Sequence, residues 1–369
     1  MLTPDLAGFH DIETPALVLD RAVLMRNIAA MVATAKSAGI ALRPHAKTHK
    51  SAEIARLQIE AGAVGICCAT VAEMEALARA KIPGLMLTTP VMDHPKLKRL
   101  AALARDADIA VVIDHANQIA AFDGLMGQGT RPLAVLVDID VGQRRTGVTD
   151  AAETVALAQL IAAKPWARFA GIQGFAGHVQ HIVDATARKA AAADVGAILT
   201  AHLAALHAAG IDAPIVTGSG TGAAAFDATG PYSELQVGSY VFMDADYGRL
   251  AGQAGGALPF EPSLYLLATV TSVNRPGEFT IDAGVKALAF NGPVPDRFIG
   301  SPAGCVYRFG GDEHGMLTLP DGAAAPKLGS RVLVLTTHCD PTVNLHACVH
   351  AVGADGDIAV WPVLARYGA

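Results

Sequence analysis

Short apolar runs typical of strands alternate with alanine-rich amphipathic stretches from about residue 40 to residue 240. Repetition of a strand-like run followed by a helical stretch is typical of parallel βα units. Eight such units predict an α/β fold with an N-terminal (β/α)8 TIM-type barrel, and an open doubly wound sheet is the alternative. The runs span residues 41–47, 64–70, 85–89, 107–114, 133–140, 169–177, 213–218 and 234–240.

The stretches between these runs have the spacing of helices. Apolar residues recur three to four positions apart in 52–62, 72–84 and 156–166, and two of these segments close on glycine. This pattern favours amphipathic helices that cover the outside of a barrel.

Beyond about residue 255 the pattern changes to strand-like runs separated by Gly, Pro and Asp, in 265–273, 279–284, 331–337 and 358–363. Such runs predict antiparallel strands joined by turns. We therefore expect a barrel domain over 22–250 and an antiparallel β domain formed by 1–21 and 251–369. The early run 16–20 precedes the first barrel helix without a barrel strand before it, so we expect it to pair with the β domain.

Composition agrees with this organisation and excludes several classes of partner. The chain has 369 residues, 52% hydrophobic and 17% charged, enough for more than one core. A formal net charge of -6 without a Lys/Arg-rich run argues against nucleic acid and anionic membranes as partners. Five cysteines without CxxC spacing fit a reducing compartment. We identify no signal peptide and no apolar stretch of about 20 residues, so we expect a cytoplasmic protein.

The first apolar run continues into RPHAKTHK, which places several basic side chains at the carboxyl end of a barrel strand. Active sites of such barrels lie at this end. Lys47 has His45 and His49 beside it, and partial burial near cationic groups lowers the pKa of an amine. Lys47 is therefore a candidate for Schiff-base formation, although a single loop lysine is more often only solvated.

Glycine-rich segments end the seventh and eighth runs and together predict a phosphate cradle. Glycines let backbone N–H groups approach an anion, and phosphate sites in these barrels commonly follow strands seven and eight. A single Gly-rich turn is more often only a tight turn. The residues concerned are Gly218, Ser219, Gly220, Thr221, Gly222, Gly238, Ser239 and Tyr240.

Two further strand ends supply polar side chains. After the fifth run, Asp140 and Arg145 lie near the barrel mouth, where Arg145 could bind a cofactor oxygen and Asp140 could orient it; a structural Asp-Arg pair is the alternative. After the sixth run come His178 and His181, and an imidazole there is suited to act as a general base near neutral pH.

The β domain contains HCDPTVNLH, in which His338 and Asp340 are two positions apart. On an extended strand these side chains would share one face and Cys339 would point the other way. An imidazole and a carboxylate held together suit a divalent ion such as Mn²⁺, Mg²⁺ or Zn²⁺. Asp312 could complete the shell or orient a bound water. An HxD pair alone is often accidental.

Taken together, the motifs resemble the D-threonine aldolase and D-serine dehydratase group of alanine-racemase-fold enzymes, in order and over nearly the whole chain. They are RPHAKTHK, DVGQRRTGV, GHVQH, GSGTG, ELQVGSYVFMDADY, DAGVKA, DEHG and HCDPTVNLH. The resemblance implies that Lys47 carries pyridoxal 5'-phosphate as a Schiff base and that the enzyme is a homodimer. It also implies a divalent metal on His338 and Asp340, with Mn²⁺ expected first and Mg²⁺, Co²⁺ or Zn²⁺ as alternatives.

The second metal position distinguishes branches of the group. The aldolases are similar to this chain in carrying Asp there, at Asp340, whereas eukaryote-type D-serine dehydratases carry Cys, so the resemblance favours a carbon–carbon lyase of the D-threonine aldolase type. Relatives often have Tyr where this chain has Phe175, so a hydrogen bond from that phenol is not expected here.

The activity implied by the resemblance is cleavage of D-threonine and related D-β-hydroxy amino acids to glycine and an aldehyde. His181, or a metal-bound water that it orients, would take the hydroxyl proton. Alternatives with the same motifs are D-3-hydroxyaspartate aldolase, and D-threo-3-hydroxyaspartate or D-serine dehydratase with Lys47 as the base. Two hypotheses from other classes are a non-catalytic pyridoxal-phosphate binding protein and a metal hydrolase without that cofactor.

Overall fold

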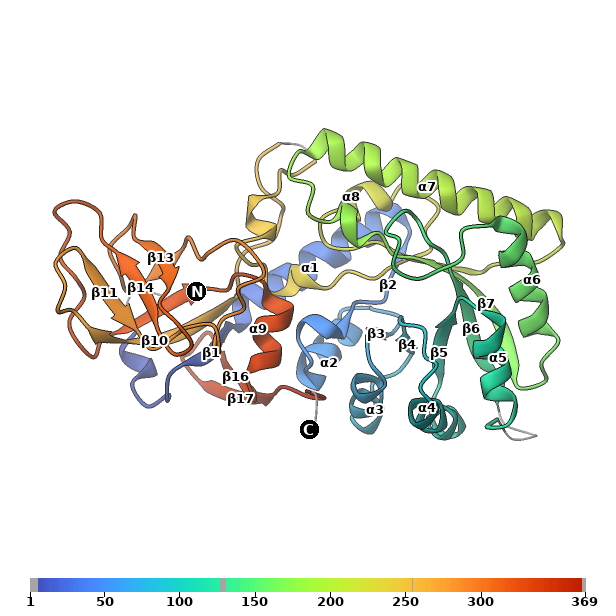
Figure 1. Cartoon of the computed structure of the whole chain (residues 1–369), viewed down its shortest axis with the longest axis horizontal. Helices are drawn as coiled ribbons and strands as arrows, with labels where there is room; N and C mark the ends of the chain where they lie inside the picture. Colours follow the sequence, from blue (N-terminus) through green and yellow to red (C-terminus); the bar gives the residue numbers. More distant parts are fainter. Residues whose placement is uncertain (1–5, 127–130, 254, 367–369) are drawn as a thin grey trace.

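Parallel strands in the first two thirds of the chain form the predicted barrel (Figure 1). The computed structural model describes residues 6–126, 131–253 and 255–366. Eight parallel strands pair in the order β2-β9-β8-β7-β6-β5-β4-β3, and a bridge between His45 and Cys67 joins the two edge strands. Neighbours in the sheet are neighbours in sequence, which confirms the barrel and excludes the doubly wound alternative. The barrel strands are β2 (Ala41–Leu42), β3 (Ile66–Cys68), β4 (Leu85–Leu87), β5 (Ile109–Ile113), β6 (Leu133–Asp138), β7 (Ala167–Gly174), β8 (Ile215–Gly218) and β9 (Glu234–Leu235).

Helices cover the outside of the barrel. Side chains of Ser51, Thr70 and Asp93 accept hydrogen bonds from the first-turn N–H groups of α2, α3 and α4, which satisfies donors that a helix leaves free at its start. The three predicted helices are found as α2, α3 and α6. The helices of the barrel region are α1 (Arg21–Ala38), α2 (Ala52–Glu60), α3 (Val71–Arg79), α4 (His94–Asp106), α5 (Ala116–Asp123), α6 (Ala151–Ala162), α7 (Ala185–Ala208) and α8 (Ala224–Asp227).

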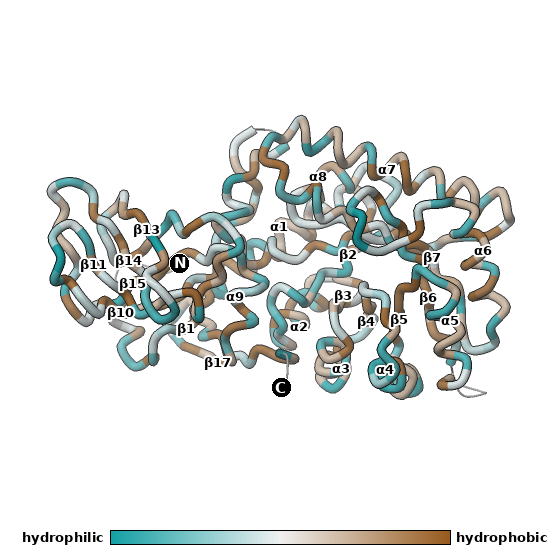
Figure 2. The backbone as a smooth tube through the Cα atoms, in the orientation of Figure 1, coloured by the Kyte–Doolittle hydropathy of each residue, from teal (hydrophilic) through white to brown (hydrophobic). Residues whose placement is uncertain are grey.

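Alternate residues of the barrel strands enter two different cores. Since successive strand side chains point to opposite faces, one set fills the barrel interior and the other packs under the helices. Figure 2 shows the strands around β5 and β6 as hydrophobic and the outer helix α4 as largely hydrophilic. The interior set comprises Cys67, Met86, Ala110, Val112, Ala134, Leu136 and Ala170.

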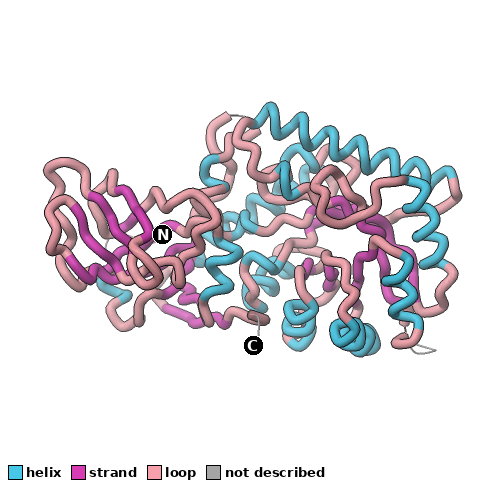
Figure 3. The backbone as a smooth tube through the Cα atoms, viewed as in Figure 1, coloured by secondary structure: helices cyan, strands magenta, loops and turns pink. Residues whose placement is uncertain are grey.

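The second sheet has nine strands and little helix (Figure 3). As predicted for the run 16–20, β1 (Ala16–Asp20) pairs with β10 and with β16 of this sheet. The domain bounds 22–250 and 1–21 with 251–369 stay a prediction, and residues 1–5, 127–130, 254 and 367–369 lie outside the described residues. The other strands are β10 (Leu264–Ser272), β11 (Glu278–Ile281), β12 (Phe298–Ile299), β13 (Val306–Phe309), β14 (Gly315–Thr318), β15 (Arg331–Leu335), β16 (Cys348–Val352) and β17 (Ile358–Pro362).

Two predicted strands end earlier than expected, at the places that carry candidate site residues. After β2, Pro44 has no N–H group to continue the ladder on one side, and the chain forms the 3₁₀ turn η2 (Ala46–Thr48). After β9 the chain turns at Gly238 into η4 (Ser239–Val241).

The HxD segment is helical, not extended. His338 has an extended backbone, but it precedes the helix α9 (Cys339–Leu345), and Asp340 lies in the first helical turn. The prediction that His338 and Asp340 share one face of a strand is therefore wrong. The sequence DPT after Cys339 explains the difference, because Pro341 near a helix start needs no N–H partner there.

Helix α7 qualifies by length and composition alone as a membrane-crossing segment, whereas the sequence led us to expect no apolar stretch of about 20 residues. It lies along the barrel in contact with α6 and α8 (Figure 1). Its Arg188 is fully buried and donates to backbone carbonyls, so the helix is tied to the barrel by its polar as well as its apolar residues.

Candidate active site

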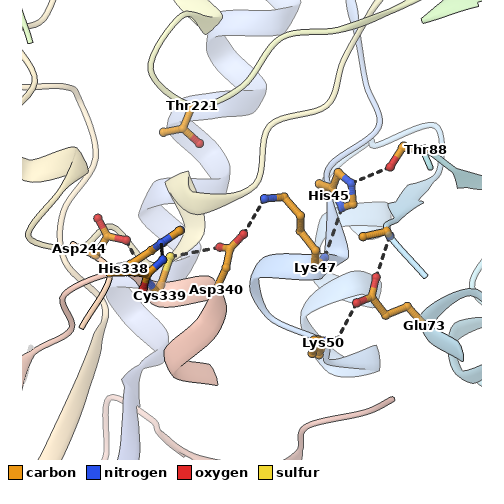
Figure 4. A network of polar contacts seen from close by, with 12 residues as sticks. His45, Lys47, Lys50, Glu73, Thr88, Thr221, Asp244, His338, Cys339 and Asp340 are labelled. Carbon is orange, nitrogen blue, oxygen red and sulfur yellow. Dashed lines mark hydrogen bonds and ion pairs between the residues drawn. The ribbon is translucent and has the colours of Figure 1, made fainter. Parts of the chain in front are cut away.

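Lys47 in η2 meets the β domain at Asp340 in α9. Its Nζ atom lies 2.7 Å from Oδ2 of Asp340, 293 residues further along the chain. The side chain of Lys47 is 40% exposed, so its amine is reachable from the barrel mouth. Figure 4 shows Lys47 extended between the two parts of the chain, with His45 on the barrel side and His338 near Asp340. The site thus lies at the junction of barrel and β domain.

Lys47 and Asp340 hold each other in the charged form. Burial disfavours ionisation of Asp340, but the Lys47 ammonium and then His338 outweigh it and hold the pKa of this carboxyl well below its usual range. The charge of Asp340 likewise outweighs burial and raises the pKa of Lys47. The expectation that its neighbours lower the pKa of Lys47 is therefore wrong. The amine must lose a proton before it can attack a carbonyl.

The two histidines beside Lys47 are buried and neutral. Burial, followed by the charge of Lys47, lowers the pKa of His45 to about 3, and burial lowers the pKa of His49 to about 4. Nδ1 of His45 accepts from the Lys47 N–H (3.3 Å), so the neutral ring carries its proton on Nε2, 3.0 Å from Oγ1 of Thr88. The Thr88 hydroxyl donates to the Cys68 carbonyl (3.1 Å). This chain of bonds fixes the ring of His45.

A cavity of about 350 Å³ lies beside Lys47, a size typical of small-molecule sites. Arg145 reaches it with its guanidinium over the Phe175 ring, 5.6 Å from the centroid, a cation–π contact that holds the arginine in place. The lining residues are His45, Lys47, Ala69, Thr88, Thr89, Pro90, Arg145, Thr146, Gln173, Phe175 and Gln236.

Asp140 does not orient Arg145, contrary to the prediction. Its Oδ1 accepts hydrogen bonds from the backbone N–H groups of Gly142 (3.0 Å) and Arg144 (2.9 Å). In the part of the chain that the structure describes, Asp140 has no hydrogen bond or ion pair with Arg145. Its role is to shape the loop that carries the arginine.

The loops after β8 and β9 are buried against each other and contain backbone donors without partners. The Tyr240 N–H donates to Oγ1 of Thr221 (3.0 Å) and ties the two loops together. Buried N–H groups without a partner are rare in proteins, and a cluster of them fits an anion such as phosphate. Among the described residues, the backbone N–H groups that make no hydrogen bond include those of Gly220, Thr221, Gly222 and Ser239, whereas the Ser219 N–H faces the Tyr232 hydroxyl.

The glycines of this cradle are required by packing. A Cβ atom on Gly220 would lie 2.7 Å from the Gln180 side chain, and one on Gly222 would lie 2.1 Å from the Gln180 carbonyl oxygen. Oε1 of Gln180 accepts from the Ala223 N–H (3.1 Å), and Nε of Arg188 donates to the Gly222 carbonyl (2.8 Å). Gln180 and Arg188 therefore set the shape of the loop, and the buried arginine adds a positive charge beside it.

Tyr240 contributes its backbone to this region but not its side chain. Its hydroxyl accepts a hydrogen bond from Nε2 of Gln58 (3.0 Å), and its ring lies 5.7 Å from that of Phe260. The structure therefore brings Gly218 to Gly222 together with Gly238 and Ser239, while the Tyr240 phenol lies in the core.

The carboxyl of Asp227 is buried beside Ser219 of the cradle, and its burial makes the stability of the protein depend on pH. This carboxyl is 5% exposed, and burial raises its pKa to about 6, against a hydrogen bond from Ser219. Because its folded-state pKa exceeds the ordinary value of 3.8, ionisation of Asp227 costs stability as the pH rises through 6.

We expect Asp227→Asn to raise the free energy of unfolding by up to about 3 kcal/mol at pH 8 and to leave it nearly unchanged at pH 4. Thermal unfolding at both pH values measures this, with the exposed Asp194→Asn as control. A destabilised variant at pH 8 would contradict it.

His181 has a carboxylate partner that suits a general base. Its Nδ1 lies 2.7 Å from Oδ2 of Asp246, and its ring lies 5.0 Å from that of Tyr247. The bond from His181, with help from Arg249, lowers the pKa of Asp246 to about 2. A carboxylate on Nδ1 leaves Nε2 free to accept a proton. The described residues give His178 no comparable partner.

His338 and Asp340 supply an imidazole and a carboxylate at the start of α9. Nδ1 of His338 lies 3.1 Å from Nδ2 of Asn291, so Nε2 is the ring nitrogen left for a ligand. Among the described residues no group of three or more His, Cys, Asp or Glu side chains could hold a metal. Two protein ligands do not make a closed zinc site, but they fit a hard cation that keeps water or substrate oxygens, such as Mg²⁺ or Mn²⁺.

Asp312 lies elsewhere on the surface. Its Oδ2 is 3.6 Å from Nζ of Lys286, which also pairs with Glu313, and its side chain is 69% exposed. The described contacts of Asp312 include neither His338 nor Asp340, so its expected part in the metal shell has no support within the chain.

Several residues of the site were not identified from sequence. Asp246 belongs to the motif ELQVGSYVFMDADY, but its contact with His181 of the GHVQH loop depends on the fold and has no local signal. Gln173 and Gln236 line the cavity from β7 and from beyond β9, and Asn291 contacts His338. A polar residue at an inward position of an apolar strand was the available signal for the two glutamines.

Comparisons with known proteins agree with this architecture. A family model described as "Alanine racemase, N-terminal domain" matches residues 19–246 and one described as "Putative serine dehydratase domain" matches 263–352. The chain is 42% identical to a D-threonine aldolase from Arthrobacter sp, over 96% of this chain and 93% of that protein. It is 37% identical to a 3-hydroxy-D-aspartate aldolase from Paracoccus denitrificans, with 98% and 95% covered. The crystal structure of D-threonine aldolase from Filomicrobium marinum matches with a TM-score of 0.91 at 40% identity, covering 97% of this chain and 96% of that one.

Proposed function

Because the chain belongs to the D-threonine aldolase and D-serine dehydratase group of fold type III pyridoxal-phosphate enzymes, we propose that it cleaves D-threonine and related D-β-hydroxy amino acids to glycine and an aldehyde. It is a pyridoxal-phosphate-dependent carbon–carbon lyase, as its aldolase relatives indicate. The observation that carries the substrate proposal is the 2.7 Å contact of Lys47 with Asp340, because it joins the cofactor lysine to the proposed metal carboxylate in one site.

Each part of the site has a role in this proposal. Pyridoxal phosphate, bound at Lys47, supplies an electron sink for the bond that breaks at Cα. The loop 219–222 would hold its phosphate, mainly through the N–H groups of Gly220, Thr221 and Gly222, and Arg145 would bind an oxygen of the cofactor. His338 and Asp340 would hold a divalent metal, whose charge lowers the pKa of a nearby hydroxyl.

His181 would act as the base that accepts the proton of the substrate hydroxyl. Its Nδ1 is held by Asp246 at 2.7 Å, so Nε2 can accept a proton directly or through one water. Asp246 then stabilises the imidazolium that results. In the dehydratase alternative, the amine of Lys47 would instead take the α-proton of the substrate, so the proton that is removed separates cleavage from dehydration.

We further propose Mn²⁺ as the metal, a homodimer as the assembly and the cytoplasm as the compartment. A ligand set of one imidazole and one carboxylate supports Mn²⁺ or Mg²⁺ above Zn²⁺. The buried or partly buried free cysteines agree with a reducing compartment.

Product analysis tests the proposed activity. We expect D-threonine to give equal amounts of glycine and acetaldehyde, and L-threonine to give neither. Chelation with EDTA should lower the rate by at least roughly 100-fold, because metal stabilisation of developing charge is worth several kcal/mol, and added Mn²⁺ should restore it. An unchanged rate after chelation would exclude the metal role of His338 and Asp340.

Dehydration is the second candidate, favoured by the serine dehydratase model that covers both proposed metal ligands. It predicts a 2-keto acid and ammonia from D-serine or D-threo-3-hydroxyaspartate. Formation of those products in place of glycine and aldehyde would replace the aldolase proposal.

A further inference from the structure

A buried carboxylate that follows the barrel receives the first N–H group of helix α9. Oδ2 of Asp244 accepts a hydrogen bond from the Cys339 N–H (2.9 Å), and Asp244 is fully buried. Figure 4 shows Asp244 beside His338 and Cys339. Cys339 stands between His338 and Asp340, so the bonded N–H belongs to the peptide unit that follows His338. This bond therefore fixes the backbone that joins the two proposed metal ligands.

The start of α9 depends on this acceptor from another part of the chain. A helix leaves the N–H groups of its first turn without partners of its own, and the side chain of the residue before the helix commonly accepts from one of them. In α9 that residue is His338, and within the described chain its side chain makes no such bond. Asp244 takes over the capping role, so the imidazole of His338 is not used for it.

The same carboxylate also holds the segment that faces the proposed base. Oδ1 of Asp244 accepts hydrogen bonds from the backbone N–H groups of Asp246 (3.1 Å) and Tyr247 (2.9 Å). The side chain of Asp246 lies 2.7 Å from Nδ1 of His181, and the Tyr247 ring lies 5.0 Å from the His181 ring. One oxygen of Asp244 thus orders the turn that faces His181, and the other orders the start of α9.

The backbone next to Asp244 is held in an unfavourable conformation. Met243, directly before it, is buried and has a φ of 49°, in the left-handed region that residues with a side chain rarely adopt. On the other side, the Ala245 N–H donates to the Thr336 carbonyl (3.0 Å), just ahead of α9. Such conformations persist where the surrounding contacts enforce them, and they cluster at functional sites. The segment is therefore fixed against the chain that leads into α9.

We propose that Asp244 is the positioning residue for the divalent cation at His338 and Asp340, and that it keeps this pair in register with His181. The proposal rests on the proposed function, which assigns the cation to that pair. Asp244 acts through the backbone of α9 on one side and through the turn that carries Asp246 on the other.

Asp244→Asn is a selective change, because an amide has one acceptor oxygen and one donor NH₂ group. The oxygen can replace Oδ1 and keep the bonds from Asp246 and Tyr247. The NH₂ group then faces the Cys339 N–H and cannot accept from it. Two bonds outweigh one, so we expect the amide to adopt this orientation. The variant should loosen the start of α9 and keep the turn that faces His181.

Cation affinity is measured with Mn²⁺ alone, on chelator-treated protein that carries pyridoxal phosphate, from the paramagnetic signal of the free ion. We expect Asp244→Asn to weaken Mn²⁺ binding by roughly 10- to 100-fold, as is typical when a residue that orients metal ligands is changed. The absorbance of the bound cofactor should stay unchanged. Hydrogen exchange in the peptide 338–345 should become faster by roughly five- to tenfold, because the Cys339 N–H loses its acceptor.

Two matched variants are controls for cation binding. Asp20 is another buried carboxylate that accepts an N–H at the start of a helix, α1, and Asn is an equally good cap there. Asp246→Asn alters the partner of His181 but keeps the backbone N–H that Asp244 receives. We expect Asp20→Asn and Asp246→Asn to keep the Mn²⁺ affinity within about twofold, although Asp246→Asn should lower kcat.

Asp244→Glu separates position from charge, because it keeps the negative charge and moves both oxygens by one CH₂ group. The positioning role predicts weaker Mn²⁺ binding in Asp244→Glu as well. Wild-type Mn²⁺ affinity in either folded Asp244 variant would overturn the role. Weaker binding in Asp244→Asn without faster exchange in 338–345 would also overturn it, because the missing charge would then explain the loss.

Circular dichroism and thermal unfolding establish which variants are folded, and one folded Asp244 variant is enough for the test. A measurement on wild-type protein covers the case in which neither folds. Mn²⁺ should then slow hydrogen exchange in 338–345 and, through Asp244, in 243–248, and protection of 338–345 alone would overturn the proposal. Wild-type protein that binds no Mn²⁺ would instead contradict the proposed function, so the two failures are distinguishable.

Discussion

Lys47→Ala is expected to abolish turnover of D-threonine, with kcat lower by roughly 10⁴-fold or more. Lys47 is the amine that lines the cavity, and no neighbouring side chain of that lining has an amine to replace it. The visible absorbance of bound pyridoxal phosphate should disappear with the lysine. Absorbance spectra and a coupled aldehyde assay on the same preparation measure both effects.

The alanine variant also leaves Asp340 without its partner, and a buried carboxylate that loses its counter-ion is destabilising. Lys47→Arg separates the two effects, because the guanidinium keeps a positive charge for Asp340 but does not form a Schiff base under these conditions. We expect Lys47→Arg to unfold close to the wild-type temperature and to be as inactive as Lys47→Ala. The exposed Lys189→Arg is the matched control. Retained absorbance in either Lys47 variant would remove the lysine from the cofactor site.

The barrel could be predicted from sequence because each strand and each covering helix leaves a local pattern. Residues 109–113 and 133–137 are apolar throughout, as is typical of strands buried on both faces. The ends of the first and eighth strands were less predictable. There the chain leaves the strand near Pro44 and Gly238, within runs that mix apolar and polar residues, and the two turns that follow carry Lys47 and Ser239.

The site was predictable in its residue types but not in its contacts. No local pattern in RPHAKTHK or HCDPT indicates that Lys47 pairs with Asp340, because that contact depends on how the barrel packs against the second sheet. For this reason the predicted direction of the Lys47 pKa was wrong: neighbours in sequence were considered, and the dominant charge lies in another domain. The partner of His181 was missed for the same reason, since Asp246 reaches it from beyond the eighth strand.

Asp340→Asn is expected to lower kcat/KM for D-threonine by roughly 10³-fold, because the stabilisation that a metal gives to developing negative charge is worth several kcal/mol. The amide matches the carboxylate in size, so the start of α9 should keep its shape. The visible absorbance of bound cofactor should remain, since Lys47 is intact, and this separates loss of the metal from loss of the cofactor. The exposed Asp321→Asn is the matched control.

A second effect of the same variant follows from the ion pair. Asp340 is the main cause that raises the pKa of Lys47, so Asp340→Asn should lower the pKa of that amine. Apoenzyme of the variant should therefore react with pyridoxal phosphate at a lower pH than wild-type apoenzyme, because a larger fraction of Lys47 is then unprotonated.

Mn²⁺ titration, followed by calorimetry or by the paramagnetic effect of the free ion, should show weaker binding in Asp340→Asn. A variant that keeps wild-type Mn²⁺ affinity but still shows the shifted reconstitution profile would limit Asp340 to controlling the lysine. A variant that loses Mn²⁺ without that shift would limit it to the metal. The 2.7 Å contact predicts both effects, because the carboxylate that pairs with the Lys47 amine is also the one proposed to bind the cation.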